Sequence, residues 1–200
     1  MSGNDGDLRV RRTRRMLRDA LADLVAERGY EAVSITALTQ RALVNRTTFY
    51  AHYRSKYDLL LEVVGETFRP VREYPLLQDA ADPWRPGMAP PAWLIAFLAD
   101  LDRDAPFYRG VLGEGGSERL RTDLRTYFAG LLEQRIGRAA VPQDGARVPP
   151  RVVAMILAAA GLGSLTWWLE QDPRDPPEQV ARWYLETVAP GALRAIGSGS

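Results

Sequence analysis

The spacing of apolar residues is the feature that most restricts the fold of this chain. In residues 8–28 the side chains of Leu17, Ala20, Leu21 and Leu24 recur every three or four positions, as on one face of an α-helix. Similar spacing recurs along the chain, and no segment shows the strict polar–apolar alternation of a half-buried strand. Most of these segments are bounded by Pro, Gly or Ser, residues that cap or end helices. The sequence therefore predicts an all-α protein.

The predicted helices follow from this spacing and from the capping residues. They cover residues 8–28, 35–42, 45–53, 56–69, 92–102, 105–112, 117–138, 150–171 and 176–188. Residues 1–7 are small and polar and are predicted to be disordered. The proline-bearing segments 70–91 and 138–150 are predicted to be loops.

Two of these helices are short and are separated by a tight turn at Leu43-Val44. Because a longer basic helix precedes them, the arrangement indicates a helix-turn-helix, whose second helix lies in the DNA major groove. The N-terminal end of that helix would carry Arg46, Thr47 and Thr48. Arginine can donate two hydrogen bonds to guanine, and threonine offers a hydroxyl and a methyl group. We therefore expect these three side chains to face base edges.

The only histidine and the only lysine of the chain follow within ten residues. Tyr50 and His52 can donate to phosphate oxygens, and Lys56 would lie in the first turn of the next helix, where free N–H groups also favour an anion. Charge supports this interpretation: residues 1–56 contain 11 Arg and Lys against 6 Asp and Glu, whereas residues 57–200 contain 15 against 19. Because the N-terminal segment is positive and the rest of the chain is mildly acidic, we predict that the N-terminal segment is the part that binds a polyanion.

These residues also carry a resemblance to a known family. The stretch at 34–60, SITALTQRALVNRTTFYAHYRSKYDLL, resembles the N-terminal domain of TetR-type (tetracycline-repressor-type) transcriptional regulators. The resemblance implies that Thr36 lies near the groove and that Phe49 and Tyr53 pack inward. One residue departs from the pattern, because the family usually has glycine in the turn where this chain has Leu43. A left-handed conformation would cost leucine roughly 1 kcal/mol more than glycine, so another turn geometry is expected.

The close resemblance covers the first third of the chain, and the rest matches the family in length and helix count. The implied organisation is a helix-turn-helix domain at 1–54 and a helical ligand-binding and dimerisation domain at 55–196. Aromatic residues of the second part are core candidates and also candidates for an apolar effector pocket. The predicted ligand-binding set is Trp93, Phe97, Phe107, Tyr108, Tyr127 and Trp167.

The segment 154–171 is rich in small residues, and glycine within a helix is costly unless it allows a close contact. These small residues could serve internal packing, and the resemblance to the TetR type implies instead that the segment forms a two-fold homodimer interface with the last helix, the commonest kind of oligomer contact. The predicted interface set is Ala159, Ala160, Gly163, Trp167, Trp183 and Tyr184.

The predicted function is a ligand-responsive regulator, most simply a repressor, that binds double-stranded DNA at a palindromic operator and is released by an apolar or aromatic small molecule. The chain has no cysteine and one histidine, so most catalytic triads and His- or Cys-rich metal sites are excluded, and neither an enzyme nor a cofactor is expected. No apolar run or leader suggests a membrane or export, so a cytoplasmic protein is expected. A protein–protein adaptor or a non-switching DNA binder with the same fold remains the alternative.

Overall fold

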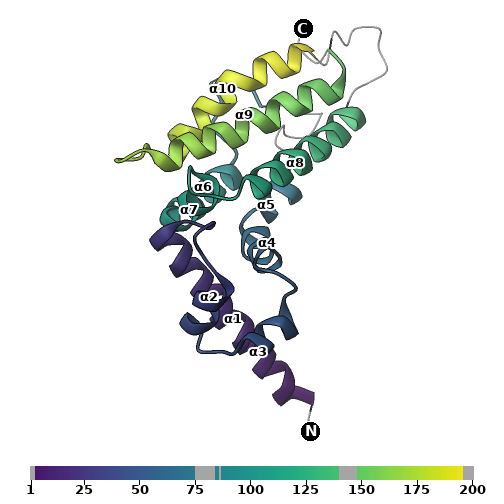
Figure 1. The fold of residues 1–200 in the computed structure, drawn as a ribbon. Coiled ribbons are helices and arrows are strands. Elements are labelled where there is room, and N and C mark those ends of the chain that lie inside the picture. The colour runs from purple at the N-terminus through teal and green to yellow at the C-terminus, as the bar shows by residue number, and fades with distance from the viewer. Residues whose placement is uncertain (1–2, 75–83, 86, 140–147, 196–200) are drawn as a thin grey trace. The chain divides into compact units, whose positions relative to one another are not determined.

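The computed structural model describes residues 3–74, 84–85, 87–139 and 148–195, and within them every regular element is an α-helix (Figure 1). The all-α prediction is therefore confirmed. The helices are α1 (Gly3–Arg28), α2 (Ile35–Arg41), α3 (Arg46–His52), α4 (Lys56–Thr67), α5 (Arg69–Glu73), α6 (Ala92–Arg103), α7 (Ala105–Leu112), α8 (Glu118–Ala139), α9 (Pro150–Glu170) and α10 (Pro177–Ala195).

The first of two compact units contains residues 1–67 and 104–117, that is, α1 to α4 together with α7. Its core lies along α1, where Leu17, Leu21 and Leu24 are almost fully buried. Helices α2, α4 and α7 each contact α1, and α3 contacts α2. The apolar face predicted for the first helix is thus the face on which this unit assembles.

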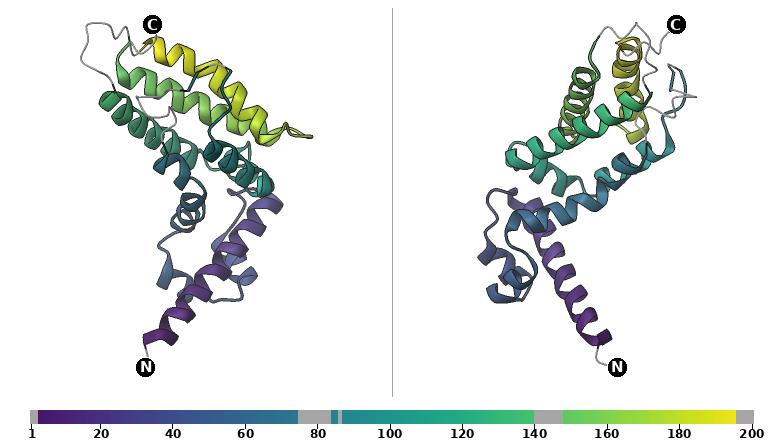
Figure 2. Two further views of the ribbon diagram at one scale, coloured as in Figure 1. Left: turned by 180° about the vertical axis from the view of Figure 1, so that it is seen from behind. Right: turned by 90° about the vertical axis from the view of Figure 1, so that its right-hand side faces the viewer.

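The second unit contains residues 68–103 and 118–200. Helix α9 lies beside both α8 and α10, and α6 packs on α10 (Figures 1 and 2). Arg135 of α8 donates hydrogen bonds to the backbone carbonyls of Val71, Arg72 and Tyr74 at the end of α5. Since carbonyls at a helix end have no partner within the helix, this guanidinium caps α5 and ties it to α8.

The structure corrects three helix ends. The first helix begins at Gly3, inside the segment predicted to be disordered. Pro70 does not simply end the fourth helix, because α5 starts one residue earlier and proline needs no hydrogen bond in a first turn. The last helix continues through Pro190 to Ala195, where burial of Ala189 and Ala192 offsets the missing backbone bond. Much of the two predicted loops, at 75–83, 86 and 140–147, lies outside the described residues.

The functional domain limits expected from the sequence, 1–54 and 55–196, stay a prediction. Grouped by their contacts, α4 and the later helix α7 fall with α1 to α3. The backbone therefore passes between the units at three places: 67–68, 103–104 and 117–118.

Candidate nucleic-acid interface

Side-chain caps fix both helices of the helix-turn-helix. The Ser34 hydroxyl accepts from the Ala37 amide at 3.1 Å, and Asn45 Oδ1 accepts from the Thr48 amide at 2.7 Å. Each cap satisfies an amide that the first helical turn leaves without a partner. The Asn45 side chain therefore fixes the first turn of α3, where the base-reading residues are expected.

The turn between the helices is left-handed at Leu43, so our expectation of another geometry is wrong. Leu43 has φ +54° and a side chain that is 86% exposed. The Leu43 amide donates to the Gln40 carbonyl at 3.2 Å and the Val44 amide to the Thr39 carbonyl at 3.0 Å. This pair of bonds is the Schellman motif, which usually places glycine where this chain has leucine. Backbone bonds thus hold leucine in the conformation that glycine adopts more easily.

Replacing Leu43 with glycine is accordingly expected to raise the free energy of unfolding by about 0.5–1 kcal/mol, because it relieves the left-handed strain and removes no packed side chain. Leu43→Ala is the matched control, since alanine keeps the strain and should leave stability unchanged. Chemical denaturation of both variants measures the difference. Equal stabilities for the glycine and alanine variants would show that the turn is not strained.

The third helix separates a buried face from an exposed one. Phe49 is fully buried and Tyr53 is 5% exposed, which confirms that both pack inward. On the other side, Arg46, Thr47 and Tyr50 are exposed. A short helix anchored by two aromatic rings therefore presents donors on its outer face, as a helix that enters a groove must.

The predicted DNA-contact residues all belong to the first unit, on α2, α3 and the start of α4. Thr36 is exposed on α2, whereas Thr48, His52 and Lys56 are half-buried. The His52 and Tyr53 ring centroids are 6.5 Å apart. The arrangement places polar side chains of three consecutive helices in one unit, and their contacts with DNA remain predictions.

Lys56 has an internal role that the sequence did not reveal. Its ammonium donates to the carbonyls of Tyr30 at 2.7 Å and Val33 at 2.8 Å, and lies 3.9 Å from the centre of the Tyr30 ring. Burial lowers the pKa of this ammonium below its ordinary value. Two of its N–H donors thus tie the loop before α2 to the start of α4, and a contact of Lys56 with a phosphate remains a prediction.

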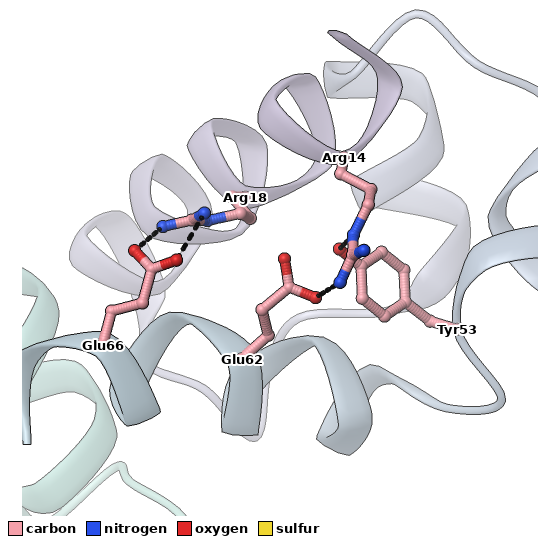
Figure 3. Close-up of polar contacts among 5 residues, drawn as sticks. All are labelled: Arg14, Arg18, Tyr53, Glu62 and Glu66. Atoms are coloured by element: carbon pink, nitrogen blue, oxygen red, sulfur yellow. Dashed lines mark hydrogen bonds and ion pairs between the residues drawn. The ribbon is translucent and has the colours of Figure 1, made fainter. Parts of the chain in front are cut away.

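Two arginines of α1 form ion pairs with two glutamates of α4 (Figure 3). Arg14 pairs with Glu62 and also donates to the Tyr53 hydroxyl at 3.4 Å, and Arg18 binds Glu66 through two hydrogen bonds of 3.1 and 2.5 Å. The hydrogen bond that Arg14 donates to Glu62, and then the one that it donates to Tyr53, raise the pKa of Arg14. Partly exposed pairs contribute about 1 kcal/mol or less each, so this cluster orients α4 on α1 more than it stabilises the fold.

Arg54 is exposed immediately after α3 and was not among the predicted DNA-contact residues. It follows Tyr50 by four positions, and that spacing was the signal that could have identified it. Its charge adds a positive group beside the exposed face of α3.

The candidate ligand residues do not gather in one place. An apolar cavity of about 90 Å³ lies in the second unit, and of the six predicted residues Phe97 lines it. Phe107 and Tyr108 are buried in the first unit on α7, and Tyr127 is exposed on α8. Trp93 stacks on Tyr74 with ring centroids 6.0 Å apart. Trp167, 49% exposed on α9, lines a shallow surface depression instead.

The cavity lining is almost entirely hydrocarbon, with residues from α6, α8, α9 and α10 and from Phe68 and Val71 near the start of α5. Among the lining residues, Ser164 and Tyr184 are the two with a polar side-chain atom. The Tyr184 hydroxyl donates to the Leu157 carbonyl at 3.0 Å, and burial raises its pKa. The lining that the structure describes has no charged group.

Of the six candidate dimer residues, four are exposed and two, Ala160 and Tyr184, are half-buried. Ala159, Gly163 and Trp167 follow one another at four-residue intervals on the exposed side of α9, and Ala160 next to them is half-buried. Trp183 of α10 is 43% exposed. The Tyr184 hydroxyl is directed inward at the Leu157 carbonyl, and the place of Tyr184 in a dimer interface stays a prediction. By length and composition alone, α9 is also apolar enough to cross a membrane.

Comparison with known proteins gives matches consistent with this arrangement. Residues 17–63 match the family described as "Bacterial regulatory proteins, tetR family". The chain is 25% identical over 181 residues to the uncharacterized HTH-type transcriptional regulator YxbF of Bacillus subtilis (strain 168); the match covers 90% of this chain and 45% of that protein. This chain thus spans less than half the length of that curated relative.

Two solved structures share the fold across nearly the whole chain. A TetR transcriptional regulator from Streptococcus agalactiae 2603V superposes with a TM-score of 0.67 at 19% identity, covering 94% of this chain and 99% of that one. The dihydroxyacetone kinase operon activator DhaS superposes with a TM-score of 0.59 at 15% identity, covering 90% and 96%. The likeness therefore extends beyond the segment that the family profile matches.

Proposed function

We propose that this chain, which belongs to the tetR family of bacterial regulatory proteins, binds a palindromic DNA operator as a homodimer and changes its affinity when a small apolar molecule binds. The observation that carries the proposal is α3, whose buried aromatic face fixes an exposed face with Arg46, Thr47 and Tyr50. Two such helices in a dimer would read half-sites about 34–36 Å apart.

The homodimer part of the proposal is supported by the exposed apolar side of α9 and by Trp183. Exposed apolar patches of this kind mark interaction surfaces. A stripe of small residues beside Trp167 also allows two helices to approach closely, so a second copy related by two-fold symmetry is a fitting partner.

The effector part is supported by the apolar cavity. A lining without charges favours an uncharged, largely hydrocarbon ligand, with Ser164 as the group that could orient it. Phe68, which lines the cavity, follows Thr67, the last residue of α4, directly in the chain. A ligand that displaces Phe68 could therefore change the position of α4, provided that it binds the DNA-incompetent state more tightly. We propose repression as the simplest effect of operator binding on transcription. DhaS, which shares this fold, is described as an operon activator.

Selection from a random DNA pool, followed by titration of the enriched sequence at two salt concentrations, tests this function. We expect an enriched palindrome whose affinity falls steeply with salt. Failure to enrich any sequence, before and after ligand is removed by refolding, would contradict the proposal and favour an adaptor.

Two substitutions on α3 distinguish base contacts from phosphate contacts. Arg46→Ala should reduce the base preference at one operator position and cost about 1–3 kcal/mol of binding free energy there. Tyr50→Phe should instead weaken binding to all sequences alike. The exposed Tyr74 of the second unit supplies the control, Tyr74→Phe, which should leave binding unchanged. An unchanged preferred sequence for Arg46→Ala would remove Arg46 from the base-reading residues.

A further inference from the structure

The N-terminal turns of α1 carry no part of the core. Every described side chain from Asp7 to Arg12 is exposed, and the first fully buried residue of the helix is Leu17. Packing therefore does not explain a helix that begins at Gly3. An exposed helical extension of this kind is available to a partner.

The charge of this extension is entirely positive from residue 8 to residue 15, which includes five arginines and no acidic residue. Two of the five are engaged: Arg14 with Glu62, and Arg11 with Asp7 at 2.6 Å. Among the described side chains, no carboxylate pairs with the other three arginines. We name these three, Arg9, Arg12 and Arg15, the arginine arm.

The spacing of the arginine arm suits an extended anion. Residues three apart on a helix lie near one another on its surface, about 4.5 Å apart along the axis. Three long, exposed guanidinium side chains thus follow one side of the helix over about 9 Å. DNA presents a regular row of phosphates, to which arginine binds well.

The arm also continues the candidate DNA surface. Arg14 reaches the Tyr53 hydroxyl just after the last residue of α3, so α1 passes the end of α3 at this level. The turns before Arg14 project past α2 and α3 (Figures 1 and 2). A duplex lying on α3 would therefore meet the arm beside the bases that α3 reads.

We propose that Arg9, Arg12 and Arg15 bind the phosphates of DNA flanking the operator core. This inference rests on the proposed DNA-binding function and extends it to DNA that α3 does not reach. The arm adds affinity without sequence preference, because phosphate contacts position a protein on DNA and do not read bases.

The test compares the triple variant Arg9→Ala/Arg12→Ala/Arg15→Ala with wild type on two duplexes: the selected operator alone, and the same operator with about ten base pairs added at each end. On the longer duplex the variant should bind roughly tenfold or more weakly, and the slope of log affinity against log salt should fall by about 0.9 for each phosphate that the variant no longer neutralises. On the trimmed operator the two proteins should bind alike. The preferred sequence should not change.

Two further variants separate charge from structure. Arg9→Lys/Arg12→Lys/Arg15→Lys keeps the charges and should retain most of the affinity for the longer duplex. Arg85→Ala/Arg109→Ala/Arg194→Ala removes the same charge from exposed positions outside the arm and should leave binding unchanged. Circular dichroism should show the same thermal transition for all variants, because none of these side chains is in the core.

Three results for the triple alanine variant would contradict a role of the arginine arm in DNA binding: an unchanged affinity and salt slope on the longer duplex, an equal loss of affinity on both duplexes, or an altered sequence preference. All three results require that wild type binds the operator selectively. If wild type bound neither duplex selectively, the proposed DNA-binding function itself would be wrong, and the inference about the arginine arm with it.

Discussion

Replacing Phe97 with alanine is expected to lower the free energy of unfolding by about 3–5 kcal/mol, the usual range for removing a buried phenylalanine ring. Phe97 is 6% exposed, and its ring centroid lies 5.2 Å from that of Phe68, which in turn stacks on Phe128 at 5.8 Å. The ring also borders the apolar cavity, so its removal would enlarge a space that the surrounding helices already leave open. Denaturant unfolding of the full chain measures the change in the free energy of unfolding.

Tyr127→Ala is the matched control, because Tyr127 is an aromatic residue of the same unit that is 48% exposed. Its replacement should cost about 1 kcal/mol or less. A small apolar ligand such as benzene should raise the melting temperature of the Phe97→Ala variant by more than that of Tyr127→Ala, which keeps the smaller native cavity, since enlarged apolar cavities bind such molecules. Equal costs for the two variants would show that Phe97 does not pack as described.

The helix-turn-helix could be predicted because its signals are local. Ser34 and Asn45 cap the helices that begin directly after them, and the family resemblance of the same stretch implied the inward positions of Phe49 and Tyr53. Leu43 shows the limit of such reasoning. Its intrinsic preference argued against a left-handed turn, but two backbone hydrogen bonds on either side of the turn outweigh about 1 kcal/mol of strain.

The cavity could not be predicted because its lining comes from residues far apart in the sequence. Composition identified aromatic candidates, yet Phe97 and Tyr127 differ in burial for reasons that depend on how α6 and α8 pack. Tyr184 was predicted at the dimer interface from its neighbours in the sequence, and no local signal pointed to the hydrogen bond that its hydroxyl donates to a carbonyl 27 residues earlier. Lys56 likewise was assigned a phosphate alone, because the carbonyls that hold it lie more than 20 residues before it.

The place of α7 was missed for the same reason, and it leads to the second prediction with a large effect. Gly110→Ala is expected to lower the free energy of unfolding by about 3 kcal/mol, at the upper end of the usual cost of overpacking. A Cβ atom at Gly110 would lie 2.4 Å from the Val25 carbonyl oxygen, which belongs to the backbone of α1 and cannot rotate away. The two helices would have to separate, and the hydrogen bond from the Tyr30 amide to the Gly110 carbonyl, 2.9 Å long, would weaken.

Gly130→Ala provides the control, because Gly130 is exposed within α8 and a Cβ atom there meets no atom within 4 Å. Alanine at that position should raise stability by about 0.5–1 kcal/mol, since it restricts the unfolded chain and favours the helix. Amide exchange at Tyr30 gives a local readout, which should become faster in Gly110→Ala and stay unchanged in Gly130→Ala. A protected Tyr30 amide and wild-type stability in Gly110→Ala would mean that α7 is not packed on α1. If both changes occur as expected, the close approach at Gly110 is one of the contacts that anchor the segment 104–117 in the first unit. Together with the junction at 67–68, that segment is then one of the covalent links through which the proposed effector in the second unit would act on α1 and its arginines.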